Sequence, residues 1–593
     1  MNLSPNPAAQ SLVSGCDAKN INANGRRSVR LFLAVATAAV MSLALVGANP
    51  AAAQAQPAAE GGLFVMAPSA TFVVNSLGDL PDVAPGNGIC ETDVSGQCTL
   101  RAAIMEANAL PGEDAIDASG MMGTITLVDG PLPTISENLT ITGPALIEGY
   151  PTLLINAGGA SRHIRIDTGV IVTISRVLLQ NGQAAESSGG AINNSGTLTL
   201  ISVMITNSHA DGDGGAIYGA GGSYTAIRAG SRIGLPGLAN SANYGGGVAI
   251  SGSTSDLIVD DSEISWNSAS ADGGGVYNWS GEVAVSNGSV IKNNVALARG
   301  GGLYNNGSGL MYILASTVAY NRAVMGGGGV YNYYSTLVAT NSTFSSNSTD
   351  GSGGGIAEES IDTLFTYNVT ITDNTADADA DGTGDGGGLF LNGFANMANS
   401  ILAGNEDLTP STLSSVHPDC SAFVFSFFTI NTHNLVGDNA GCATHFVNGA
   451  SGNQVGSPVS PLDPVLGSLT STFGGTPLHP VLAGSPAIDR GEPDGCQDHI
   501  GPFHQGNAGP PILTVDQRGM ARPQNGRCDV GAYEAAWPQI ENQFFSVPEF
   551  SPNGTEVGVV VVSDPNGGFE VLPVITGGNG TGDGAFYFAK SGY

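Results

Sequence analysis

Three carboxylates stand close together near the middle of the chain, at Asp260, Asp261 and Glu263. If they lie on one strand, alternate residues share a face, which brings Asp261 and Glu263 together. A carboxylate pair can act as acid and base on a glycosidic bond, can bind a cation, or can simply lie in water at the surface. The solvated arrangement is the simplest of the three, and Asp261 and Glu263 are the catalytic candidates if the protein is an enzyme.

Other catalytic signals are sparse. A lyase would use a cluster of basic groups, but the basic residues between positions 228 and 322 are not spaced to form one. The eight histidines show no metal-ligand spacing, and no serine or cysteine occupies a nucleophile-elbow sequence. The sequence favours a non-catalytic protein, with a polysaccharide lyase or glycoside hydrolase as the alternative.

Tyrosines recur at a fixed interval, because Tyr277, Tyr304 and Tyr331 are each 27 residues apart. In a stack of coils they would form a stripe of rings, with Trp279, Tyr333 and Tyr334 nearby. Exposed rings can bind sugars or a partner protein, whereas buried rings pack one coil on the next. If exposed, these three tyrosines are the best binding surface that the sequence offers.

The elements that would position these side chains repeat along the chain. Glycine clusters precede an apolar residue and an alternating strand eight times, at intervals of 25 to 33 residues, before Ala191, Ala216, Val248, Val276, Leu303, Val330, Ile356 and Leu389. A period of this length without helical signals predicts a β-solenoid. The glycines indicate a corner with positive φ or close approach between coils.

One asparagine per coil follows the second strand, at Asn267, Asn293, Asn321, Asn347, Asn374 and Asn405. Stacked coils would place these amides in one ladder, where each bonds to its copy above and below. A row of polar ligand contacts is the alternative.

The two ends of the coil region carry different signals. Residues 26–53 are typical of an export signal, with three arginines before an apolar run and an Ala-Ala-Ala site, so the segment 1–54 would be removed. Six cysteines remain, in three local pairs that an oxidising compartment would close as disulfides: Cys90 with Cys98, Cys420 with Cys442, and Cys496 with Cys528. Leu100, Ile104 and Ala107 share a helical face after the possible cap Thr99, which predicts a short helix that plugs the solenoid.

The stretch Cys98-Thr99-Leu100-Arg101-Ala102-Ala103-Ile104, followed by Glu106-Ala107-Asn108, resembles the CSLREA motif of exported bacterial β-helix proteins. The family pattern has an acidic residue at the position of Ala102, so an ion pair from that position to Arg101 is not available. By resemblance to pectate-lyase-like folds, the coils imply a right-handed parallel β-helix.

An ordered string of short motifs between Asn399 and Glu534 resembles the choice-of-anchor Q domain. The motifs include Asp516-Gln517-Arg518-Gly519, Arg522-Pro523 and Cys528-Asp529-Val530-Gly531-Ala532-Tyr533-Glu534. This resemblance implies a surface or secreted protein and no defined catalysis.

The last fifty residues resemble the first half of a cadherin-like repeat, on the motifs Val547-Pro548-Glu549, Asn553-Gly554-Thr555 and Ser563-Asp564-Pro565-Asn566-Gly567. The resemblance implies calcium as a ligand of Glu549, Asp564 and Asn566. Phe550 stands where the family has asparagine, and the later acidic motifs are absent.

The formal charge of −32, with only 18 Lys and Arg, makes a nucleic acid an unfavourable partner. No stretch after the export segment is long and apolar enough to span a bilayer.

We expect an all-β protein with an export segment (1–54), an N-terminal cap (55–122), β-helix coils (123–398), a choice-of-anchor Q-like region (399–538) and a small β-sandwich fragment (539–593). It would be secreted or displayed at the cell surface and bind an extracellular glycan or a surface protein. A passive structural stalk is a third possibility.

Overall fold

The computed structural model describes residues 69–359, 363–413, 415–471, 475–497, 512–524 and 526–535, all within one compact unit. The expected export segment, the β-sandwich fragment and the calcium candidates Glu549, Asp564 and Asn566 lie outside the described residues.

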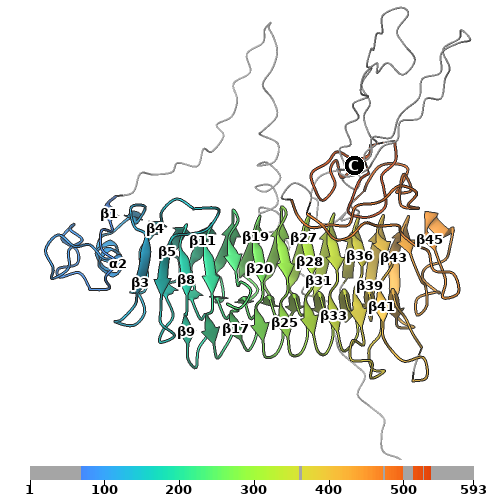
Figure 1. Ribbon diagram of the computed structural model, residues 1–593, viewed down its shortest axis with the longest axis horizontal. Coiled ribbons are helices and arrows are strands. Elements are labelled where there is room, and N and C mark those ends of the chain that lie inside the picture. Colours follow the sequence, from blue (N-terminus) through green and yellow to red (C-terminus); the bar gives the residue numbers. More distant parts are fainter. Residues whose placement is uncertain are drawn as a thin grey trace, which may run out of the picture. The chain divides into compact units, whose positions relative to one another are not determined.

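The chain winds into a parallel β-solenoid, as the glycine repeat predicts, with coils stacked one on the next (Figure 1). Its architecture is consistent with a right-handed parallel β-helix. Equivalent residues become vertical neighbours: Tyr277 pairs with Tyr304 and Tyr304 with Tyr331 in successive strands. The sequence interval of the repeat is therefore the length of one coil.

Four parallel sheets run along the solenoid. Sheet 1 contains β1 (Thr71–Val73), β2 (Asp114–Asp117), β4 (Leu139–Thr142), β7 (Ile171–Ser175), β11 (Thr197–Ile201), β15 (Tyr224–Arg228), β19 (Asp256–Asp260), β23 (Glu282–Ser286), β27 (Leu310–Leu314), β31 (Thr336–Thr340), β35 (Thr363–Tyr367), β39 (Phe394–Ala398) and β43 (Phe427–Thr432). Sheet 2 contains β3 (Gly123–Thr126), β5 (Leu153–Asn156), β8 (Leu178–Gln180), β12 (Met204–Thr206), β16 (Arg232–Ile233), β20 (Glu263–Ser265), β24 (Val290–Lys292), β28 (Thr317–Ala319), β32 (Thr343–Ser345), β36 (Thr370–Thr372), β40 (Ile401–Leu402), β44 (Leu435–Val436) and β45 (Gln454–Val455).

Sheet 3 contains β6 (Ile164–Ile166), β10 (Ile192–Asn194), β14 (Ile217–Gly219), β18 (Val248–Ser251), β22 (Val276–Trp279), β26 (Leu303–Asn306), β30 (Val330–Tyr333), β34 (Ile356–Glu359), β38 (Leu389–Leu391) and β42 (Cys420–Ala422). Sheet 4 contains β9 (Gln183–Ala184), β13 (His209–Ala210), β17 (Ser241–Ala242), β21 (Ser268–Ala269), β25 (Val295–Ala296), β29 (Arg322–Ala323), β33 (Ser348–Thr349), β37 (Thr375–Ala376) and β41 (Glu406–Asp407). A 3₁₀ turn, η1, spans Ala450–Gly452.

The glycine clusters lie where sheet 4 turns into sheet 3, and close packing of backbones explains them. A Cβ at Gly274, Gly301 or Gly328 would lie 2.3–2.5 Å from a carbonyl oxygen of the next coil. The residue just before each of these glycines has positive φ, as at Gly273 and Gly300. Only glycine satisfies both conditions, so the clusters mark every coil.

An internal asparagine ladder forms at the corner between sheets 2 and 4, with a one-residue correction. The expected Asn293 lies outside the ladder in a left-handed turn (φ 55°), and Asn294 takes the place. Each amide Nδ2 donates to the Oδ1 of the next member at 2.9–3.0 Å. The members are Asn240, Asn267, Asn294, Asn321, Asn347, Asn374 and Asn405, and the carboxylate of Asp419 ends the ladder.

The expected N-terminal plug is the helix α2 (Leu100–Ala109), where the Thr99 side chain accepts a hydrogen bond from the backbone N–H of Ala102 at 3.0 Å. Arg101 is buried and pairs with Asp79 at 2.9 Å. Asp79 is thus the acidic partner of Arg101, a role that Ala102 cannot fill. Glu106 accepts the backbone N–H groups of Gly86 and Gly88, which fixes the preceding loop on the helix.

The stacked coils continue beyond position 398, through β45, and then the chain turns back. The described residues between 456 and 535, which we call the return segment, pack on the outer face of sheet 2. Leu478, Val481, Val530 and Tyr533 form a second apolar core there with Ile401 and its neighbours. The predicted disulfide pairs are all present, and Cys420 belongs to the last strand of sheet 3.

Candidate functional site

A cleft of about 800 Å³ lies between the coils and the return segment. One wall comes from four successive coils and the other from the return segment, so residues more than 200 positions apart meet. The lining side chains that can hydrogen-bond include Arg232, Asp261, Glu263, Asn287, Thr476, Gln517 and Arg518.

Both catalytic candidates line this cleft, but not in the manner the alternation rule predicts. Asp261 lies in the turn between β19 and β20 with φ 47°, so only Glu263 belongs to a strand. Glu263 lies 3.3 Å from the ammonium of Lys292 and accepts the Ser265 hydroxyl at 2.6 Å. Burial, and then the neighbouring charge of Asp260, raise the pKa of Asp261. The pair therefore differs in environment, as an acid and a base would.

The return segment forms its wall through residues of the choice-of-anchor resemblance. Gln517 reaches between two coils, where it accepts the Thr343 hydroxyl at 2.6 Å and its Nε2 donates to Thr317 at 2.9 Å. Arg518 pairs with Asp516 at 2.7 Å and stacks on Tyr533 at 3.6 Å. Gln517 therefore holds the wall on the coils, whereas Arg518 braces the return segment internally through Asp516, Glu534 and Tyr533.

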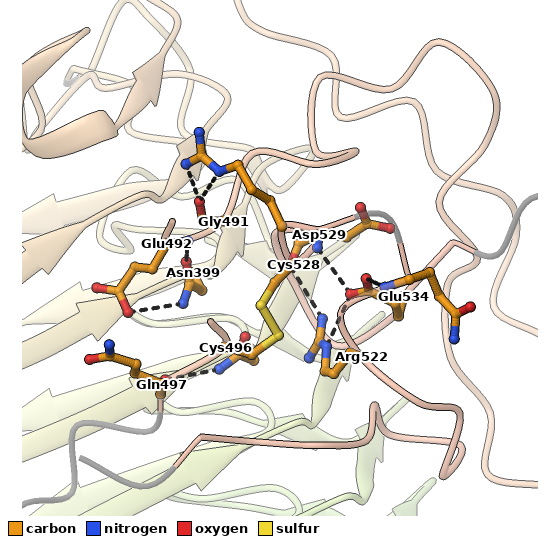
Figure 2. The surroundings of a disulfide bond; sticks show 12 residues. Asn399, Gly491, Glu492, Cys496, Gln497, Arg522, Cys528, Asp529 and Glu534 are labelled. Carbon is orange, nitrogen blue, oxygen red and sulfur yellow. Dashed lines mark hydrogen bonds and ion pairs between the residues drawn. A yellow bond between two sulfur atoms is a disulfide. The ribbon is translucent and has the colours of Figure 1, made fainter. Parts of the chain in front are cut away.

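A buried polar network behind the wall surrounds the disulfide of Cys496 and Cys528 (Figure 2). Arg522 pairs with Glu534 at 3.1 Å, and both side chains are almost fully buried. The backbone N–H of Glu492 donates to Asn399 Oδ1 at 2.8 Å, which ties the segment to the coils.

The tyrosine stripe stacks as predicted. Ring centroids of Tyr277 and Tyr304 are 5.4 Å apart, those of Tyr304 and Tyr331 are 5.6 Å apart, and the rings are nearly parallel. These side chains are only 2–8% exposed. Burial, with the nearby Asp272, raises the pKa of Tyr304 to about 12, and Arg299 lies over the Tyr331 ring. The stripe packs one coil on the next and leaves no ring face for a sugar.

The next outward row on the same sheet is partly exposed, and the sequence reasoning mentioned its aromatics only as neighbours of the stripe. Strand pairing aligns Trp279, Asn306 and Tyr333 in successive coils, two residues beyond the stripe. Trp279 is 47% exposed, Asn306 and Tyr333 are half-buried, and Tyr334, which follows Tyr333 in the chain, is 48% exposed. Tyr333 and Tyr334 meet edge to face at 4.4 Å. We call Trp279, Asn306, Tyr333 and Tyr334 the aromatic row. The two-residue alternation of a strand is the signal that could have identified it.

Among the described residues, Asp377, Asp379 and Asp381 bring carboxylate oxygens within 4.8 Å of one another. Their Asp-x-Asp-x-Asp-Gly spacing, which the sequence reasoning missed, is typical of calcium loops. Asp377 is fully buried and accepts the Thr409 hydroxyl at 2.8 Å. These three residues could hold a hard cation such as Ca²⁺.

No family model, no curated protein and no solved structure matches this chain. Within the part of the chain that the structure describes, no helix has the length and apolarity needed to cross a membrane.

Proposed function

We propose that this protein is exported or displayed at the cell surface, where it binds an extracellular glycan through the aromatic row without altering it chemically. The exposure of Trp279 and Tyr334 at the two ends of the aromatic row is the observation that carries the proposal. Aromatic faces stack on the apolar faces of sugar rings, and flanking amides bond to hydroxyls. The resemblances to the CSLREA and choice-of-anchor Q families support the location.

The geometry suits an extended chain more than a small molecule. Trp279 and Tyr333 are two coils apart, about 10 Å at the usual strand spacing. Asn306 lies between them, and its Nδ2 donates to the Tyr304 hydroxyl at 3.3 Å, which orients the amide. The buried tyrosine stripe beneath the row holds its backbone rigid. A preorganised row of this kind loses little conformational entropy on binding.

Titration with neutral and acidic oligosaccharides, followed by calorimetry and tryptophan fluorescence, tests the proposal. We expect Trp279→Ala and Tyr334→Ala to weaken binding by about tenfold or more each, because each loses one buried aromatic contact. Trp266→Asn is the matched control, since Trp266 is also exposed (40%) and lies in another corner of the coils.

Two outcomes would overturn the proposal. If the unchanged protein binds no glycan, it is a passive stalk or a receptor for another class of partner. If Trp266→Asn weakens binding as much as Trp279→Ala does, the aromatic row is not the site.

The cleft supports a second candidate function, a glycoside hydrolase or polysaccharide lyase, because Asp261, Glu263 and Arg232 line it together. Incubation with acidic and neutral polysaccharides would then release reducing ends or unsaturated products. Turnover should be lost in Asp261→Asn or Glu263→Gln and kept in Glu406→Gln, a control whose exposed carboxylate is not among the cleft-lining residues. Glycan binding without turnover would leave only the first proposal.

A further inference from the structure

A carboxylate follows the aromatic row on the next coil. In the register of sheet 3, Tyr333 of β30 pairs with Glu359 of β34, so Glu359 occupies the next position of the row. Glu359 is half-buried, and its backbone carbonyl accepts the N–H of Tyr334 at 3.4 Å. A charged side chain therefore stands one coil, about 4.8 Å along the solenoid, beyond the last aromatic residues of the row.

Glu359 is held in place by the tyrosine stripe beside it. Its carboxylate forms a hydrogen bond with the side chain of Tyr331. Burial, and then the charge and the hydrogen bond of Glu359, raise the pKa of Tyr331, so the tyrosine hydroxyl keeps its proton and donates to the carboxylate. An ionised carboxylate has about four acceptor positions, so Tyr331 fixes Glu359 and leaves it able to accept further hydrogen bonds.

The strands and turns of the aromatic row contain no basic residue that could balance this charge. Residues 276–281, 303–309 and 330–336 include neither Lys nor Arg. Arg299 precedes β26, at the opposite end of that strand from Asn306, and its guanidinium lies over the Tyr331 ring at 5.4 Å. The Arg299 backbone N–H also donates to the Asp272 carboxylate at 3.0 Å. An anionic sugar bound along the row would therefore approach Glu359 without an opposite charge beside it.

The uncharged part of the row suits hydroxyl groups. The amide of Asn306 is oriented, because its Oδ1 accepts the N–H of Gly307 at 2.6 Å and its Nδ2 donates to the Tyr304 hydroxyl at 3.3 Å. A side-chain amide has two N–H donors, so one is left for a sugar hydroxyl. Hydroxyls can also donate to Glu359, whereas an ionised uronic acid or sulfate group only accepts hydrogen bonds. The polar groups of the row therefore match an uncharged sugar.

We propose that the aromatic row selects uncharged glycans, and that Glu359 is the specificity-determining residue that rejects carboxylated and sulfated chains. This inference rests on the proposed function, because it concerns the ligand of the same surface. Glu359 attracts hydroxyl donors and repels anions, so one side chain supplies both the favourable contact and the unfavourable one on which specificity depends. The formal charge of −32 acts in the same direction at longer range.

Titration calorimetry with matched hexasaccharides tests this proposal. Hexamers of glucose, galactose and mannose are each compared with the hexamer of the corresponding uronic acid. A chelator in the buffer prevents a divalent cation from bridging two carboxylates. Within a pair that binds, we expect the neutral hexamer to bind at least about fivefold more tightly at about 0.01 M salt. This affinity ratio should fall at about 0.15 M salt, because salt screens the repulsion between the carboxylates.

Glu359→Gln should lower the affinity ratio by at least about threefold, because glutamine keeps the size of the side chain and an acceptor oxygen but lacks the charge. Asn306→Asp, which places a carboxylate in the middle of the row, should raise the ratio. Glu406→Gln is the matched control, because it removes an exposed carboxylate from sheet 4 and should leave the ratio unchanged. A circular dichroism melt shows that each variant is folded.

The possible results separate this inference from the proposed function. A uronic acid hexamer that binds the unchanged protein more tightly than its neutral counterpart would overturn the inference and leave glycan binding in place. An unchanged ratio in Glu359→Gln would do the same. An equal fall of the ratio in Glu406→Gln would also overturn it, since the charge of the whole chain would then explain the discrimination. If none of the hexamers binds, the proposed function fails and the inference fails with it.

Discussion

At the scale of single residues, the ladder asparagines let a polar side chain occupy the interior of every coil. Asn321 shows the arrangement: its Oδ1 accepts both the backbone N–H and the amide of Asn294, and its Nδ2 donates to Ile291 and Asn347. All of its hydrogen-bonding groups are satisfied within the buried corner. A buried polar network in which every group is hydrogen-bonded specifies one register of stacking.

Replacement of Asn321 by alanine should destabilise the coils by about 3 kcal/mol or more, because several buried partners lose their hydrogen bonds. Asn293→Gly should change stability little, since Asn293 is half-buried outside the ladder and already has positive φ. Urea unfolding of the two variants measures the difference. Equal destabilisation would contradict a specific contribution from the ladder.

His163 is fully buried, and its Nε2 lies 3.0 Å from the carbonyl of Ile155 and 3.1 Å from that of Gln180. Burial lowers its pKa to about 4. Between pH 6.5 and 4 the His163 side chain binds a proton in the unfolded chain but not in the folded chain. The free energy of unfolding therefore falls as the pH falls, by about 3 kcal/mol at pH 4. Between pH 7 and pH 4.5 the free energy of unfolding should fall less in the His163→Gln variant than in the unchanged protein. Urea unfolding at the two pH values measures the difference. Parallel curves for the two proteins would show that His163 does not contribute.

At the scale of elements, a buried ion pair stabilises the return segment internally, and one of its partners also bonds to the coils. Arg522 contacts Glu534, the carbonyl oxygen of Gly531 and, on the coils, Asn341 Oδ1 at 2.8 Å. Removal of one partner of such a pair leaves the other charge buried and unpaired.

Arg522→Met should therefore loosen the return segment by about 3–5 kcal/mol and expose it to protease before the coils unfold. Arg490→Met is the matched control, because Arg490 is exposed in the same segment. Limited proteolysis followed by mass spectrometry locates the first cuts. First cuts within the coils of the Arg522→Met protein would contradict this account.

At the scale of the whole molecule, the three disulfides all lie outside the middle coils of the solenoid. One closes the loop before α2, one joins β42 to the loop that covers the last coil, and one lies within the return segment. The coils between β10 and β37 contain no cysteine. Their stability comes from stacking, in which each coil contacts only its neighbours.

Reduction should therefore increase hydrogen exchange in the described residues of 79–97 and 437–535 and leave the described residues of 192–376 protected. Exchange measured by mass spectrometry with and without reductant tests this. Uniform loss of protection along the chain would show that the ends and coils unfold as one unit.

The sequence by itself determined the solenoid, because coil stacking turns a repeat interval into a vertical neighbour relation. Glycine spacing, the tyrosine interval and the cysteine pairs each depend on residues close in sequence or on one repeat length. The N-terminal helix was predictable for the same reason, since Thr99 and the apolar spacing act locally. Asn293 was misassigned because a turn shifts the side-chain direction by one residue, which periodicity alone does not resolve.

The tertiary structure alone decided what is exposed and what meets across long separations. Repetition aligns Tyr277 with Tyr304, but the three-dimensional packing decides that the tyrosine stripe is buried and that Trp279 is exposed. The cleft could not be foreseen, because the return segment packs on sheet 2 through contacts such as Gln517 with Thr317, 200 residues apart. Such contacts depend on the complementary shape of two surfaces, and no local pattern in the sequence encodes that shape.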